Sequence, residues 1–135
     1  MITLTHYFGS RIRHPEAAQE IQAAAAVMLG KVNALLNAAT VAGIPCLINP
    51  KTNSQISGTT EGGFRLCDCD VGKARSSHKE GRGVDVYDPS NALDKWVTDE
   101  ILEKFGLYRE HPSATNTWLH LTDRPPKSGR RTFYP

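Results

Sequence analysis

The sequence lacks the features that mark membrane, secreted or disulfide-bonded proteins. None of its apolar runs approaches the ~18 residues of a membrane span, and its first residues contain no apolar core of a secretory signal. Its three cysteines are an odd number, which favours reduced thiols over a disulfide scaffold. We therefore expect a protein made in the cytoplasm, with no signal peptide and no membrane partner.

A strong charge of either sign is also missing. The net charge is +2 at pH 7, which requires no nucleic-acid partner and would not repel an anionic polymer such as cell-wall glycan. The chain has no internal repeat, low-complexity tract or linker, and its 135 residues suffice for one hydrophobic core. We expect a single domain over residues 1–135 that is a monomer.

One long helix dominates the first part of the chain. Apolar residues recur at steps of three and four between Pro15 and Ala42, which predicts a helix over this whole range. Pro15 suits a first helical turn, and Gly43 is a typical residue just after a helix end. Because its apolar stripe is continuous, we expect this helix to belong to the core and to carry no chemistry.

The rest of the chain predicts short strands and one further helical region. Residues 91–106 have the pattern of one helix or two short ones ended by Gly106. Residues 68–77 have no clear period, and the tail 123–135 is irregular. Short strands are expected at 45–50, 62–67, 83–87, 107–110 and 117–122. The predicted fold class is α+β, with the long helix packed on a short, mainly antiparallel sheet.

Two of these strands carry polar side chains on one face. Val84 and Val86 point to one side of their strand, so Asp85 points to the other side. In the last strand two leucines share one face, so Trp118 and His120 share the opposite one. If the apolar faces pack on the helix, the carboxylate and the imidazole both project from the outer face of the sheet.

A second histidine can join them. His78 lies in a loop that leads into the strand of Asp85, and Gly81 and Gly83 allow that loop to fold back tightly. Two histidines and one carboxylate, with a fourth position open for water, form a catalytic zinc set. Taken singly, each of these residues fits an ordinary loop or sheet position in a protein without metal better than a metal site.

Three segments resemble a known family in the same order along the chain. SSHKEGRGVDVYDP, residues 76–89, resembles the S-x-H-x-x-G-x-A-x-D motif of the D-Ala-D-Ala carboxypeptidase and L-alanyl-D-glutamate endopeptidase family. TWLHL resembles the second motif, W-x-H, and GGFRLC resembles the G-Y-R segment. Members are zinc peptidases of bacterial cell-wall peptides, many are phage lysins, and their fold is related to the hedgehog signalling domain.

The resemblance implies roles for individual residues. It implies a zinc ion, Zn²⁺, whose ligands are His78, Asp85 and His120. It also implies that Arg65 holds a carboxylate or carbonyl of the peptide or the oxyanion, the alternative being a surface salt bridge. Ser76 is expected to orient a ligand or the substrate backbone, or to cap the loop, and Trp118 is expected to contact substrate.

The sequence departs from the family at one catalytic position. The family has an aspartate or glutamate three residues before the second histidine, as proton acceptor for the water, and here that residue is Thr117. We expect Glu110 to replace it. A hairpin turn centred near Ala114 pairs Glu110 with Trp118 and sets it diagonally from His120, ~7–8 Å away.

Several alternatives remain open at this stage. Glu110 can equally be a solvated turn charge, and His111 and Glu80 are weaker candidates for the base. The first expected function is a zinc metallopeptidase that hydrolyses peptidoglycan stem peptides, as an endolysin acting at the cell wall after release or within a bacteriophage particle. The second is a catalytically weakened zinc-binding module that recognises peptides or has a structural role in a phage. The third is a metal-free α+β protein.

Overall fold

The computed structural model describes residues 1–69 and 76–135, and it confirms the mixed α+β class. Short 3-10 helices lie at Gly9–Arg13, Ser77–Glu80 and Pro112–Ala114. The α-helices are α1 (Leu4–Phe8), α2 (Gln19–Val41), α3 (Ala92–Trp96) and α4 (Asp99–Phe105). The strands are β1 (Gly83–Tyr87), β2 (Tyr108–Glu110), β3 (Trp118–Thr122) and β4 (Thr132–Phe133). Part of the segment 68–77, for which the sequence showed no period, lies outside the described residues.

The four strands form one sheet in the order β1-β3-β2-β4. β3 lies between β1 and β2 and is antiparallel to both, whereas β4 pairs with β2 in parallel. In the β1–β3 ladder Asp85 lies directly opposite His120. Since directly opposed residues project from the same face of a sheet, the carboxylate and the imidazole become neighbours.

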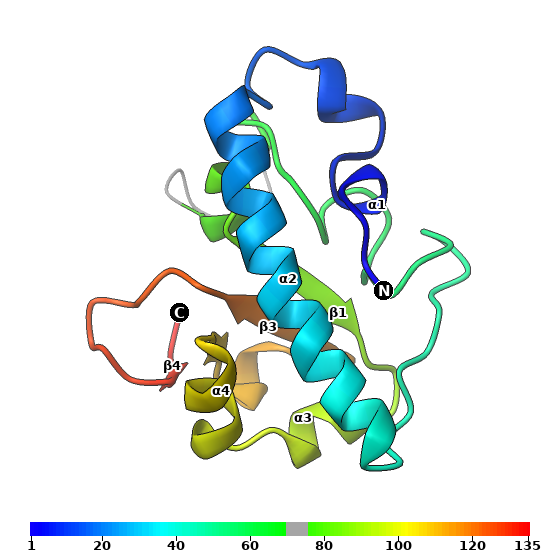
Figure 1. The fold of residues 1–135 in the computed structure, drawn as a ribbon, viewed down its shortest axis with the longest axis vertical. Coiled ribbons are helices and arrows are strands. Elements are labelled where there is room, and N and C mark those ends of the chain that lie inside the picture. The colour runs from blue at the N-terminus through cyan, green and yellow to red at the C-terminus, as the bar shows by residue number, and fades with distance from the viewer. Residues whose placement is uncertain (70–75) are drawn as a thin grey trace.

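Helix α2 packs across one face of this sheet, in front of β1 and β3 in Figure 1. The alternating apolar residues of both strands are fully buried, as the sequence predicted, and they share one core with the buried side of α2. The residues of this core are Val84, Val86, Leu119 and Leu121 from the strands and Met28, Leu29, Val32, Leu35 and Leu36 from the helix. The polar residues of β1 and β3 therefore point away from α2.

The long helix begins later than the sequence predicted. It starts at Gln19, with Ala18 as its N-cap, and not at Pro15. Pro15 lies instead in a turn in which the backbone N–H of Ala17 donates to the carbonyl of His14 at 2.9 Å. Ala18 then has an extended backbone with a ψ of 162°, which separates this turn from the helix. The predicted end of the helix before Gly43 is correct.

By length and composition α2 is apolar enough to cross a membrane. The core helix of a soluble protein meets the same criteria, so this property is weak evidence for a membrane segment. Seven residues of α2 are buried against the rest of the chain.

Two predicted strands, at 45–50 and 62–67, are wrong. Residues 49–65 form a loop that runs along the outer edge of β1 and touches it through single hydrogen bonds. The backbone N–H of Asp85 donates to the carbonyl of Gly62, and its carbonyl accepts from the N–H of Ser57, both at 2.8 Å. Inside the loop the buried amide of Asn49 donates to two backbone carbonyls, so side-chain hydrogen bonds replace a regular ladder.

The end of the chain contains a strand that the sequence did not reveal. Residues 123–135 were expected to be irregular, but Thr132 and Phe133 form β4 beside β2. A strand of two residues has no measurable alternation, and it exists because β2 offers it an edge. The predicted helical region 91–106 forms the two short helices α3 and α4, and Gly106 ends the second in a left-handed conformation.

Candidate metal centre

Three elements bring the predicted metal ligands together. His78 lies in the 3-10 helix Ser77–Glu80, Asp85 in the middle of β1, and His120 in the middle of β3. Gly81 follows the 3-10 helix with a φ of +71°, and a side chain there would collide with the backbone of α2. The turn that returns His78 to the strand therefore depends on this glycine, as the sequence predicted.

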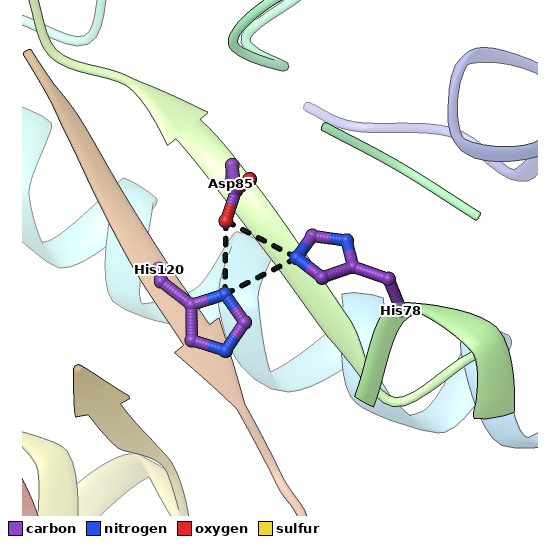
Figure 2. Close-up of side chains that lie close together, drawn as sticks. All are labelled: His78, Asp85 and His120. Carbon is purple, nitrogen blue, oxygen red and sulfur yellow. Dashed lines mark hydrogen bonds and ion pairs between the residues drawn. The ribbon is translucent and has the colours of Figure 1, made fainter. Parts of the chain in front are cut away.

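Three side-chain atoms converge on one point (Figure 2). The Nε2 of His78 lies 3.2 Å from the Oδ1 of Asp85 and 3.2 Å from the Nδ1 of His120, and the latter two atoms are 2.8 Å apart. All three residues are buried. They form a group that could hold a metal ion.

The protonation of His78 fits a metal ligand. Its Nδ1–H donates to the backbone carbonyl of Gly63 at 2.8 Å, since a carbonyl can only accept. In a neutral ring the Nε2 atom then carries a lone pair, and this lone pair faces the carboxylate of Asp85. Burial lowers the pKa of His78, although the charge of Asp85 acts in the opposite direction. The ring therefore stays neutral to a lower pH than an ordinary histidine.

The spacing of the three atoms also fits a cation. Tetrahedral zinc with bonds of about 2.0–2.1 Å places its ligand atoms roughly 3.3 Å apart. The observed separations of 2.8, 3.2 and 3.2 Å are close to this value. A lone pair of His78 and a carboxylate oxygen repel each other at such a distance unless a proton or a metal ion lies between them, so the donor set fits a bound metal.

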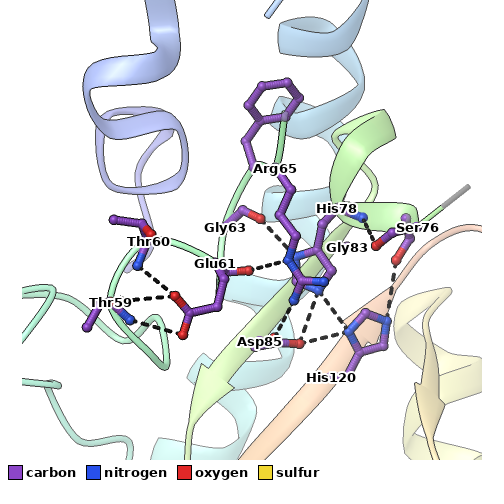
Figure 3. Close-up of polar contacts among 12 residues, drawn as sticks. Thr59, Thr60, Glu61, Gly63, Arg65, Ser76, His78, Gly83, Asp85 and His120 are labelled. Atoms are coloured by element: carbon purple, nitrogen blue, oxygen red, sulfur yellow. Dashed lines mark hydrogen bonds and ion pairs between the residues drawn. The ribbon is translucent and has the colours of Figure 1, made fainter. Parts of the chain in front are cut away.

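Asp85 has a second partner on its other oxygen. The Nη2 of Arg65 lies 3.2 Å from the Oδ2 of Asp85 (Figure 3). The Nε–H of the same arginine donates to the backbone carbonyl of Glu61 at 2.6 Å. Burial alone would raise the pKa of Asp85, but the imidazoles of His78 and His120 beside the carboxylate lower it by more, so this pKa lies well below its ordinary value. The carboxylate is therefore ionised throughout the neutral range. Arg65 is buried at the site and is not a surface salt bridge.

The two neighbouring serines have different positions. The hydroxyl of Ser76 accepts a hydrogen bond from the backbone N–H of His78 at 3.3 Å and caps the 3-10 helix. Ser77 was not predicted from the sequence to belong to the site. Its hydroxyl lies 3.4 Å from the Nε2 of His120. Ser76 thus supports the backbone of one ligand, whereas Ser77 contacts the ring of the other.

The contacts of Ser77, His120 and Asp85 follow the order of a Ser–His–Asp triad. However, Ser77 is buried, whereas a serine nucleophile must be accessible to its substrate. A triad also has no role for His78, whose Nε2 lies 3.2 Å from the Oδ1 of Asp85 and 3.2 Å from the Nδ1 of His120. A metal centre accounts for all three ligand atoms, and a serine nucleophile does not.

A cleft of about 520 Å³ opens beside Asp85, and the two histidines lie behind this carboxylate and do not line the cleft. The loop 49–65 contributes Lys51, Glu61 and Arg65 to its lining, and the strands β1 and β3 with the residue before β3 contribute Tyr87, Trp118 and Thr117. Asp85 belongs to the same lining. The predicted position of Trp118 on the outer face of the sheet, beside the metal ligands, is consistent with this arrangement.

Glu110 lies in a different register from the predicted one. Tyr108 pairs with Thr122, so the hairpin is centred on Thr115 and continuing the ladder places Glu110 directly opposite His120. The predicted pairing of Glu110 with Trp118 is wrong by two residues, because the 3-10 helix Pro112–Ala114 and the buried Thr115 make the turn asymmetric. A shift of two leaves every side chain on its predicted face.

The other two base candidates have partners of their own. Glu80 forms an ion pair with Arg124 at 2.8 Å, and the ring of His111 stacks on Tyr134 with centroids 4.5 Å apart. Sequence reasoning also missed Glu61, which lines the cleft. The carboxylate of Glu61 accepts hydrogen bonds from Thr59 and Thr60. Burial raises the pKa of this carboxyl, but the hydrogen bonds lower it by more, so Glu61 is a weak base.

Gly83 offers a direct test of this packing. A Cβ atom at Gly83 would lie 2.9 Å from the Cβ of Ser77 and 3.2 Å from the Cε1 of His120, and closer still to the Ser77 hydroxyl. We expect Gly83→Ala to lower the affinity for zinc by about ten- to a hundredfold, the usual effect of disturbing groups around metal ligands. Zinc titration monitored by calorimetry measures the change.

Gly30→Ala is the matched control. Gly30 lies in α2 and an added Cβ would meet no atom within 4 Å, so this variant should bind zinc as the parent does. If Gly83→Ala binds zinc with unchanged affinity, the close packing around His120 has no part in holding the metal.

Comparisons of the chain with protein-family models, with curated proteins and with solved structures found no match.

Proposed function

We propose that this protein is a zinc metallopeptidase that hydrolyses peptide bonds of peptidoglycan stem peptides. The observation that carries the proposal is the convergence of His78, Asp85 and His120 beside a cleft that can take a peptide. The resemblance of residues 76–89 and of TWLHL to the motifs of the cell-wall peptidase family supports it, since the same three residues occupy the ligand positions. The same resemblance suggests a hedgehog-like fold.

The side chains around the cleft suggest how the reaction proceeds. Zinc at such a site supplies a Lewis acid that polarises a peptide carbonyl and lowers the pKa of a water molecule to about 7. Trp118 and Tyr87 would contact the peptide, and Arg65 would fix the carboxylate of Asp85 while facing the substrate from the same cleft. Glu110, on the face of His120, would accept the proton of the water and pass it to the leaving amine.

The resemblance also suggests where the protein acts. We propose that it is a phage-related lysin of the endolysin type, made in the cytoplasm and active as a monomer at the bacterial cell wall after release or as part of a phage particle. Its partner is then the peptidoglycan peptide, with neither nucleic acid nor membrane involved.

A second candidate is a zinc-binding module that recognises peptides, or serves in a phage particle, without cutting them. The observation that favours it is Thr117 at the position where the family has a carboxylate. In addition, Glu110 is not among the residues that line the cleft.

Digestion of purified peptidoglycan tests the proposed function. Zinc-loaded protein should release peptides with new amino and carboxyl termini, which mass spectrometry identifies together with the bond that is cut. Asp85→Ala should release none, because it removes a ligand of the metal. Binding to peptidoglycan without release of peptides would instead support the second candidate.

A further inference from the structure

Thr117 has a backbone conformation that its side chain disfavours. Its φ is +76°, in the left-handed region that β-branched residues rarely adopt. Glycine would adopt this conformation at no steric cost. A threonine is expected at such a place only if its side chain does something that glycine cannot.

The surrounding structure imposes this conformation from both sides. The backbone N–H of Thr117 donates to the Oδ1 of Asn91 at 2.9 Å, and its carbonyl accepts from the N–H of Asp88 at 3.1 Å. Asp88 is itself buried, and its carboxylate accepts from two backbone N–H groups at the start of α3. Thr117 is therefore held in place by the connection between β1 and α3.

The side chain of Thr117 does not offset the backbone strain through packing. The residue is exposed, and within the part of the chain that the structure describes its hydroxyl has no hydrogen-bond partner. It lines the cleft together with its neighbour Trp118 and with Lys51 and Glu61. A strained residue with an unused hydroxyl in a cleft has the character of a ligand contact.

We propose that Thr117 is a substrate-contact residue, whose strained backbone presents the hydroxyl to the main chain of a peptide bound in the cleft. This inference rests on the proposed function for the nature of the ligand. It gives Thr117 a task other than the proton transfer that a carboxylate at this position would perform. A hydroxyl can both donate to a peptide carbonyl and accept from a peptide N–H, so it suits a peptide backbone of any sequence.

Three substitutions of Thr117 separate the effect of its hydroxyl from the effect of its strained backbone. Thr117→Val keeps the shape and the strain but removes the hydroxyl, Thr117→Ser keeps the hydroxyl, and Thr117→Gly removes both. For zinc-loaded protein acting on muropeptides released from purified peptidoglycan, we expect kcat/KM to fall about tenfold for valine and glycine and to stay within about twofold for serine. Thr117→Gly should also raise the melting temperature by roughly 2–5 °C as the strain is relieved.

Asn53→Gly is the matched control, because Asn53 also has a positive φ, +51°, but does not line the cleft. It should cleave as the parent does, with a smaller change in melting temperature, since asparagine tolerates this conformation. Full activity of both Thr117→Val and Thr117→Gly would overturn the proposal while leaving the peptidase intact.

Calorimetry measures the affinity for the same muropeptides, and it tests the contact even if the protein does not cleave them. If the parent binds without cleaving and Thr117→Val binds about tenfold more weakly, the contact is supported and the peptidase is not. If the parent neither binds nor cleaves, both the contact and the proposed function are overturned.

Discussion

Replacing His78 or His120 with alanine is expected to lower the zinc content of the purified protein from about one equivalent to below ~0.2 equivalents per chain. Each substitution removes one of the three atoms that meet within 3.2 Å, and the two that remain cannot hold the ion against competition from water. Elemental analysis of protein purified without added metal measures the loss. Cleavage of peptidoglycan should disappear together with the zinc.

Two other histidines serve as controls. His6 and His14 lie in the N-terminal segment and do not belong to the metal cluster, so His6→Ala and His14→Ala should keep the parent's zinc content. If these variants lose zinc as completely as the first pair, the ligand assignment is wrong. If none of the four loses any, the metal is bound elsewhere or not at all.

Glu110→Gln is expected to slow peptidoglycan cleavage by ~10²–10⁴, the usual effect of removing a general base, and to leave the zinc content unchanged. The reason is the register of β2 and β3, because continuing it by one residue beyond the last pair, Arg109 with Leu121, places Glu110 opposite His120 and on the same face of the sheet. A carboxylate near a dication remains ionised and available to accept a proton, whereas an amide cannot accept one. Initial rates on purified peptidoglycan at saturating zinc measure the effect.

Glu103→Gln provides the same change of charge at an exposed position of α4, and it should cleave as the parent does. A Glu110→Gln variant that keeps the parent's rate would show that Glu110 is a solvated charge beside the turn. The proton would then have to pass through another group, and Glu61 in the cleft is the next carboxylate to replace.

The sequence predicted that His78, Asp85 and His120 lie together because their positions follow from simple rules. Alternation in β1 and β3 assigned Asp85 and His120 to the face away from the apolar core, and pairing of the two strands then made them neighbours. Glycine at position 81 explained how His78 returns to the strand. These rules are local or depend on one strand pairing, which is why a single sequence can supply them.

The parts that the sequence did not predict depend on contacts between distant segments. The carbonyl of Gly63 that orients His78, and the hydroxyl of Ser77 that reaches His120, are brought there by the fold and leave no periodic signal. Residues 45–50 and 62–67, which overlap the two ends of the loop 49–65, were predicted to be strands because their apolar residues resemble short strands. The hydrogen bonds of this loop come instead largely from side chains such as Asn49. The positive φ of Thr117 is likewise imposed by Asn91, 26 residues away in the chain.

Restoring the metal to chelator-treated protein tests the central claim most directly. The protein is freed of metal, zinc is added from zero to three equivalents, and the release of peptides from purified peptidoglycan is followed at each step. A zinc peptidase with ligands His78, Asp85 and His120 should be inactive without metal, gain activity in proportion to added zinc, and reach its maximum at about one equivalent. Full cleavage by the metal-free protein, or uptake of one zinc without any cleavage, would contradict the account.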